Sequence, residues 1–156
     1  MLLMAMAALV MARMIGALAK GSLYTARQSA ALSGSRRALV NAGGERGLVW
    51  AAQEASAVRS LDASTLQLVL PGPVNADFIV EGSSVLVKTE GGVDFKQASA
   101  ISSMTVSYYG MGADGLISQS TAASQASLVQ VVLTVKGKAA KDRTYSIVSG
   151  AWLRNR

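Results

Sequence analysis

The sequence predicts an α+β fold, in which a long N-terminal hydrophobic helix packs through its C-terminal half on an antiparallel β-sheet. Two observations carry this prediction. Residues 1–60 contain no proline and are rich in the helix formers Ala, Leu, Met, Arg and Gln. Residues 64–155 instead contain apolar segments of alternating polarity, separated by glycine and proline turns. A helix followed by strands, in a chain of 156 residues, favours one helical layer on one sheet with a single core.

The first element is a helix over 1–22. Met1 to Leu18 contain one charge, Arg13, which costs about 2.5–3.5 kcal/mol near the middle of a bilayer. Three interpretations are open: a retained helix in a membrane or helix bundle, a cleaved signal ending at Ala17-Leu18-Ala19, or a buried core helix. We expect the retained helix, because the first ten residues are apolar on every face. The expected membrane- or filament-core residues are Leu2, Leu3, Met4, Met6, Leu9, Val10, Met11, Met14 and Ile15.

The second element is an amphipathic helix over 23–60, which with a sheet over 64–155 would form the globular domain 23–156. Its sheet-facing residues recur at spacings of three and four. They are Leu48, Ala51, Ala52, Ala55 and Val58. Gly43, Gly44 and Gly47 each weaken a helix by roughly 1 kcal/mol relative to Ala, so we predict a bend, frayed turn or break at 41–47. We expect Trp50 and Trp152 to pack where helix and sheet meet.

The sheet follows from alternating segments and short turns. Glycine-containing turns, such as those at Pro71-Gly72-Pro73 and Gly91-Gly92, indicate antiparallel pairing. One of Tyr108 and Tyr109 should be buried and the other exposed, because neighbours in a strand alternate between faces. The predicted strands are 64–70, 76–82, 84–90, 93–97, 102–110, 127–137 and 143–154.

Composition excludes several kinds of chemistry. The chain has no cysteine and no histidine, which excludes disulfides, the usual zinc sites, thiol nucleophiles and Ser-His-Asp triads. No P-loop, dinucleotide fingerprint or paired-carboxylate motif occurs. We therefore expect no enzyme, no catalytic residue, no cofactor, no metal and no small-molecule substrate.

The remaining signals favour no ligand. The net charge of +6 is concentrated in residues 1–60, where seven Lys or Arg face two acids. These bases are spread out without interleaved aromatics, so nucleic acid is not an expected partner. Asp114, with Asp94 or Asp142, lacks the oxygen-rich spacing of a calcium loop and is expected to be a solvated turn residue. The polar segment 110–126 is either a flexible loop or a partner-contact surface.

Several segments, taken in order, carry a family resemblance. They are "SLYTARQSAAL", "GLVWAAQEASAVRSLDASTLQLVLP", "FIVEGSSVLVKTEGG", "QASAISSMTVSYYGMGADG", "SLVQVVLTVKG" and "RTYSIVSGAWLRNR". Together they resemble the type IV pilin superfamily, meaning minor pilins and the pseudopilins of type II secretion, especially the J- and W-like subunits. The resemblance implies a structural subunit of a type IV pilus or type II secretion-like filament, processed from a prepilin and N-methylated.

The same resemblance implies the partners and the location. The partners would be other pilin or pseudopilin subunits in a hetero-oligomeric filament, the inner membrane and the assembly platform. The chain would be a single-pass inner-membrane protein with a periplasmic or extracellular globular domain until it assembles.

One feature of the family is missing. The basic leader, the processing-site glycine and the Phe-Thr-Leu-x-Glu opening do not occur, and Glu45 is the first acidic residue. We expect the natural chain to begin several residues upstream of Met1; otherwise this chain has diverged. The alternative function, from another class, is an exported, soluble, β-rich binding module from which residues 1–19 are removed as a signal peptide.

Overall fold

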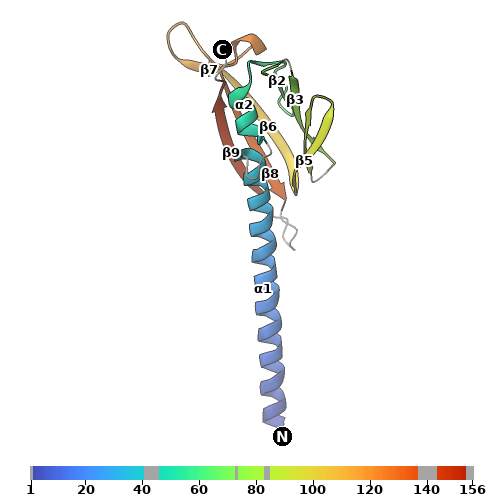
Figure 1. The fold of residues 1–156 in the computed structure, drawn as a ribbon. Helices are drawn as coiled ribbons and strands as arrows, with labels where there is room; N and C mark the ends of the chain where they lie inside the picture. Colours follow the sequence, from blue (N-terminus) through green and yellow to red (C-terminus); the bar gives the residue numbers. More distant parts are fainter. Residues whose placement is uncertain (1, 41–45, 73, 83–84, 137–143, 154–156) are drawn as a thin grey trace.

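The molecule is a helical rod that carries a β-rich head (Figure 1). The computed structural model describes residues 2–40, 46–72, 74–82, 85–136 and 144–153, and for residues 2–10, 31 and 40 it describes the backbone alone. The rod is α1 (Leu2–Val40), a helix of 39 residues, which is about 58 Å long at 1.5 Å per residue.

A second, short helix begins the head. α2 (Leu48–Glu54) starts after Gly47, whose backbone is extended, and ends at Ala55. The predicted break at 41–47 lies between the two helices. Residues 41–45 are outside the described residues, and Arg46 and Gly47 are not helical. The helical face predicted over 48–58 therefore ends early, and Val58 belongs to a strand.

The strands form two antiparallel sheets. The first contains, in spatial order, β1 (Ala57–Val58), β2 (Leu66–Leu70), β3 (Val74–Glu81), β4 (Val85–Glu90) and β5 (Val93–Ser99). The second contains, in spatial order, β7 (Ile117–Gln119), β6 (Ile101–Met111), β8 (Leu128–Lys136) and β9 (Thr144–Trp152). A short 3-10 helix, η1 (Ala123–Gln125), precedes β8.

Register follows the alternation of apolar residues. Phe78 of β3 lies opposite Leu66 of β2 and Lys88 of β4, and Val106 of β6 lies opposite Val131 of β8. The register shifts once in the β4–β5 pair and once in the β6–β8 pair. Most strands thus present one face to the interior, because side chains alternate across a strand, whereas the three residues of β7 are all exposed.

The prediction of a long helix packed through its C-terminal half on one sheet is wrong. The strands divide into two sheets that pack on each other, with β3 and β4 against β6. α1 reaches the core through its last turns only, where Ser35, Ala38 and Leu39 are buried. The fold is α+β only in the sense that helices and antiparallel strands coexist; most of the head is strand.

The physical reason lies at the crossing between the sheets. Ala100 separates β5 from β6 and has a φ of 66°, a left-handed conformation rare for a residue with a side chain. Its carbonyl accepts a 3.0 Å hydrogen bond from the backbone N–H of Lys136, so this bend is tied to β8. The bend sends the chain into a second sheet instead of extending the first.

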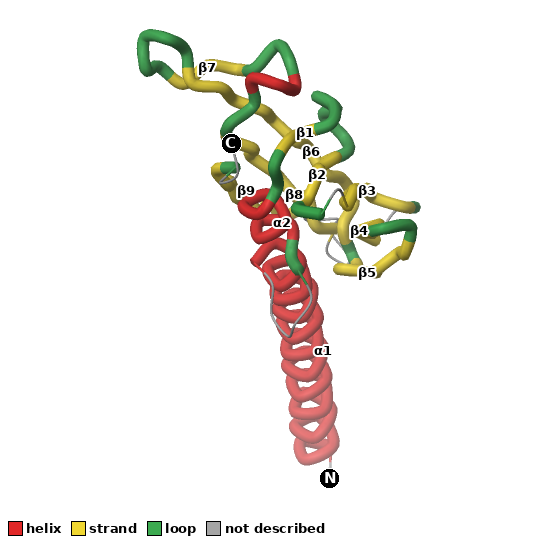
Figure 2. Tube along the Cα trace, turned by 45° about the horizontal axis from the view of Figure 1, so that its top comes forward, coloured by secondary structure: helices red, strands yellow, loops and turns green. Residues whose placement is uncertain are grey.

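The core lies between the two sheets and beneath α2. In Figures 1 and 2, α2 lies between β9 on one side and β2 to β5 on the other, and it contacts both β9 and β2. Tyr108 is buried and Tyr109 is half-buried. Trp50 packs at the edge of the core, but Trp152 is 45% exposed. The prediction that Trp152 packs between helix and sheet is therefore wrong. The largest fully buried side chains are Phe78, Leu39, Leu48, Leu66, Leu68, Leu70, Leu86, Ile101, Leu133, Val129, Val131 and Val135.

Candidate assembly surface

The exposed rod is the largest feature that the head does not cover. Every side chain of α1 from Met11 to Arg27 is exposed, and in Figure 1 this part of the helix projects beyond the head. Five large apolar side chains are 58–72% exposed: Met11, Met14, Ile15, Leu18 and Leu23. Large exposed apolar side chains gathered on one element in this way indicate an interaction site.

The predicted rod residues fall into two groups. Met11, Met14 and Ile15 lie on this exposed surface. The side chains of Leu2, Leu3, Met4, Met6, Leu9 and Val10 lie outside the described residues. In the part of the chain that the structure describes, no helix is both long enough and apolar enough to cross a membrane.

Three hydroxyls on α1 are hydrogen-bonded within the helix. The hydroxyls of Ser22, Thr25 and Ser33 donate hydrogen bonds of 2.9–3.0 Å to carbonyls three or four residues earlier. Such hydroxyls can face an apolar partner without leaving a donor unpaired. The rod's charges all have one sign, because α1 contains five basic residues and no acidic one.

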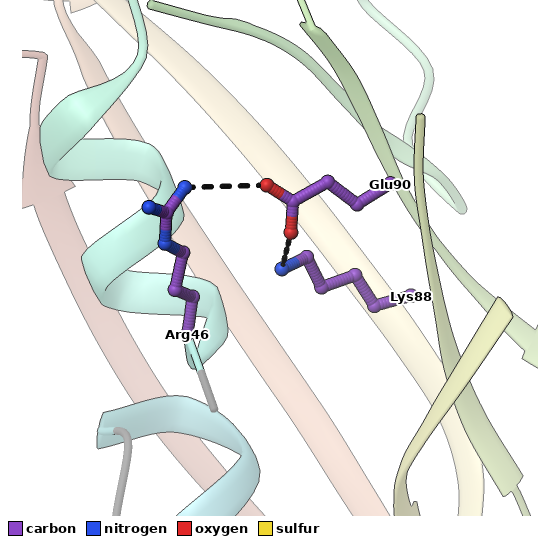
Figure 3. A network of polar contacts seen from close by, with 3 residues as sticks. All are labelled: Arg46, Lys88 and Glu90. Atoms are coloured by element: carbon purple, nitrogen blue, oxygen red, sulfur yellow. Dashed lines mark hydrogen bonds and ion pairs between the residues drawn. The ribbon is translucent and has the colours of Figure 1, made fainter. Parts of the chain in front are cut away.

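Where rod and head join, a charged network links α2 to the first sheet (Figure 3). Arg46, just before α2, donates from Nη1 to Oε1 of Glu90 at 3.3 Å. The other carboxylate oxygen of Glu90 accepts a hydrogen bond from Nζ of Lys88. Lys88 is 3% exposed, and a buried ammonium requires such a partner.

Two aromatic rings complete this network. The Arg46 guanidinium lies 4.5 Å from the centroid of the Trp50 ring, and Nζ of Lys88 lies 5.7 Å from that of Phe95. Both arrangements are cation–π contacts. The first contact lies within the start of α2 and the second joins β4 to β5, so it is the Arg46–Glu90 pair that links the start of α2 to β4. β5 also contacts α1.

The five residues predicted to pack helix on sheet are all buried: Leu48, Ala51, Ala52, Ala55 and Val58. The first three lie on α2, Ala55 follows it, and Val58 lies in β1. The network residues Lys88 and Glu90 were not predicted. Their signal was present, because Leu86, Lys88 and Glu90 alternate in β4 and share its inner face.

A tyrosine anchors the turn before β2. The Tyr108 hydroxyl lies 3.0 Å from the Asp62 carbonyl and 3.1 Å from the Thr65 carbonyl, and donates to them. Burial, with the nearby Asp62 carboxylate, raises the pKa of Tyr108 to about 12. Hydrogen bonds from the backbone N–H and hydroxyl of Ser64, both 2.7 Å, lower the pKa of Asp62. This pair serves the fold, since Tyr108 is buried within the core.

Comparisons with protein-family models, curated proteins and solved structures find no match. Among the described residues, no group of three or more acidic side chains could hold a metal ion. Asp114 accepts the Leu116 N–H at 3.1 Å, and Asp94 accepts the Thr89 hydroxyl at 2.6 Å, as turn residues do. Asp142 lies outside the described residues.

The segment 110–126 is more ordered than a plain loop. It contains β7 and η1, and the N–H groups of Ser120 and Ser127 donate to the carbonyls of Tyr108 and Tyr109 at 2.9 and 2.8 Å. Its tip exposes Met111, Leu116 and Ile117. The exposed rod remains the more extensive surface of the two.

Proposed function

We propose that this chain is a structural subunit of a pilus-like filament, a minor pilin or pseudopilin of a type IV pilus or type II secretion-like system. The observation that carries the proposal is the exposed apolar rod on a folded head. The described part of the chain leaves large apolar side chains from Met11 to Leu23 more than half exposed, and burying each of them contributes about 1.5–3 kcal/mol. Neighbouring rods in a fibre core would supply that cover.

The proposal also concerns where the chain lies before it assembles into a fibre. Residues 1–18 contain a single charge, so we propose that this stretch is held in the inner membrane, with the head on the periplasmic or extracellular side. Partner subunits and an assembly platform would then draw the rod into the fibre. The flexible methionines at 1, 4, 6, 11 and 14 suit irregular gaps between helices.

The proposal is tested in the cells that produce the protein. Antibodies against the head should detect it in fibres sheared from the cell or assembled in the envelope, and electron microscopy should locate it along them or at their tips. The matched control is a Leu18→Asp variant, which places a carboxylate among the exposed apolar side chains. Fibres should lose this variant while the head still reacts with a conformation-sensitive antibody.

The N-terminus separates this function from the exported binding module. Mass spectrometry of the native protein should find residues 1–18 retained, and a methylated first residue upstream of Met1 would be the strongest support. A mature chain beginning at Lys20 would refute the filament proposal and favour the soluble module instead.

A further inference from the structure

A seven-residue repeat runs along the exposed part of α1. The triplet of one variable residue, Ala and a basic residue occurs at 11–13 (Met-Ala-Arg), 18–20 (Leu-Ala-Lys) and 25–27 (Thr-Ala-Arg). Seven residues are almost two helical turns, so equivalent positions stay on one face and drift by only about 20° per repeat. A sustained seven-residue repeat is typical of helices that supercoil around one another.

The repeat divides the rod into two opposite faces. Its basic residues Arg13, Lys20 and Arg27 form one line, which we call the basic ridge. The ridge lies two residues beyond the first position of each triplet, or about 200° around the helix. Between Met11 and Leu32 the opposite face, which we call the seam, carries no charge; it consists of Met11, Met14, Ile15, Leu18, Gly21, Ser22, Thr25, Gln28, Ser29 and Leu32. Arg36 lies at the same angle about the helix as Leu18 and ends this uncharged stretch.

The first position of the repeat is exposed along the rod and buried where α1 enters the head. The first position of the repeat runs from Met11 through Leu18, Thr25 and Leu32 to Leu39. Leu39 is fully buried in the head, whereas Met11 and Leu18 are exposed. Because this position drifts by about 80° over the four repeats from Met11 to Leu39, the head covers a neighbouring face of the helix, and the seam is exposed from Met11 to Thr25.

Charge decides which face can meet another rod of the same kind. Two copies facing each other through their ridges would bring only positive charges together, because α1 contains no acidic residue. Two copies facing through their seams bring no charges together. Gly21 has nothing within 4 Å of its Cβ position, so a second backbone can approach closely there.

We infer that the seam is a homotypic interface, in which the rod of a second copy of this chain packs along Met11 to Leu32 while the basic ridge points away. This inference rests on the proposed function, since it names the face through which the rods of a filament would meet. It adds a definite prediction that the filament proposal alone does not make: contacts should follow a period of 3.5 residues.

The test uses the absence of cysteine from the chain. Single-cysteine variants of the full chain in mild detergent are oxidised, and disulfide-linked dimers are counted. Leu18→Cys, Ser22→Cys, Thr25→Cys and Ser29→Cys should cross-link about fivefold more than Lys20→Cys, Leu23→Cys and Arg27→Cys, because only the former lie on the seam. Leu23→Cys is the matched control for Leu18→Cys, since both leucines are exposed on the rod.

A second measurement avoids cysteine chemistry. Leu18→Gln should weaken self-association at least about tenfold by light scattering, while Leu23→Gln changes it less than about twofold. Equal yields at all positions, or maxima at 20 and 27, would overturn the inference. So would a monomeric rod that only binds vesicles, or one that pairs only with the helix of a different subunit.

The two proposals fail separately. If fibres contain the protein but the cross-linking profile is flat, the seam is wrong and the filament function stands. If the seam pattern appears but no fibre contains the protein, the rods associate for another purpose and the filament function is wrong.

Discussion

Replacing Glu90 by Gln should destabilise the head far more than replacing its partner Lys88 by Met. Lys88 is 3% exposed, and its ammonium is paired with the Glu90 carboxylate. Removing the carboxylate leaves a buried, uncompensated charge, which costs about 3–5 kcal/mol in comparable pairs. The Glu90 side chain is 20% exposed, so we expect Glu90→Gln to lower the free energy of unfolding by about 3 kcal/mol.

The reverse change leaves a less costly group behind. In Lys88→Met the Glu90 carboxylate keeps its ion pair with Arg46 at 3.3 Å and its contact with water. The free energy of unfolding should therefore fall by about 1 kcal/mol or less. Arg46→Gln removes a pair whose arginine side chain is 52% exposed, together with the Trp50 ring contact, and should also cost about 1 kcal/mol.

The assay is urea unfolding of the full chain in a nonionic detergent, followed by tryptophan fluorescence, with free energies compared at constant m-value. The double variant Glu90→Gln/Lys88→Met should be close to Lys88→Met alone, because the unpaired ammonium is then gone. Equal losses for Glu90→Gln and Lys88→Met, or a double variant less stable than Glu90→Gln, would refute this account of the network.

Three further predictions concern the head. The pKa of Tyr108 lies at about 12, above its ordinary value of 10.0, so the folded state holds a proton that the unfolded state releases first. At most about 3 kcal/mol of stability, present below pH 10, should be lost between pH 10 and 12, and Tyr108→Phe should remove that loss in an alkaline unfolding series. Gly110→Ala places a Cβ 2.6 Å from the Gln125 carbonyl oxygen and should lower the free energy of unfolding in urea by about 1–3 kcal/mol. Gly112→Ala should lower it less, because its Cβ meets the Asp114 side chain, which can move. The nine-residue edge strand β9 contains no charge and no proline, so its edge is unprotected against pairing with another chain. Val148→Lys, at an exposed site, should therefore lower concentration-dependent light scattering with little change in the free energy of unfolding. Unchanged scattering would contradict the idea of an unprotected edge.

Local pattern was sufficient to predict most elements of this chain. Seven strand segments were predicted within two residues of β2, β3, β4, β5, β6, β8 and β9, because alternating apolar residues and glycine turns are local signals. The two short strands β1 and β7 were missed. β1 has two residues and lies within the predicted helix, and β7 has three and lies in the predicted loop.

The partition of strands into sheets was not predictable from pattern. Alternation says that a strand has an inner face, but not which sheet contains it. The decision depends on the left-handed backbone at Ala100 and on its bond to Lys136, which no periodicity reveals. Likewise, burial of Lys88 depends on a glutamate in the same strand and an arginine 42 positions earlier in the chain, brought together by the fold.

The way the head is built determines how far the rod can be tested without unfolding it. The core is closed by the two sheets, α2 and the last turns of α1, and the seam residues Met11, Leu18 and Thr25 contribute nothing to it. Substitutions there change what the rod meets and leave the packing of the head intact. Changes in the charged network should do the opposite, lowering head stability while the uncharged seam stays the same. A variant of Leu18 that unfolded the head, or a variant of Glu90 that altered the cross-linking period, would show that rod and head are coupled in a way that these contacts do not provide.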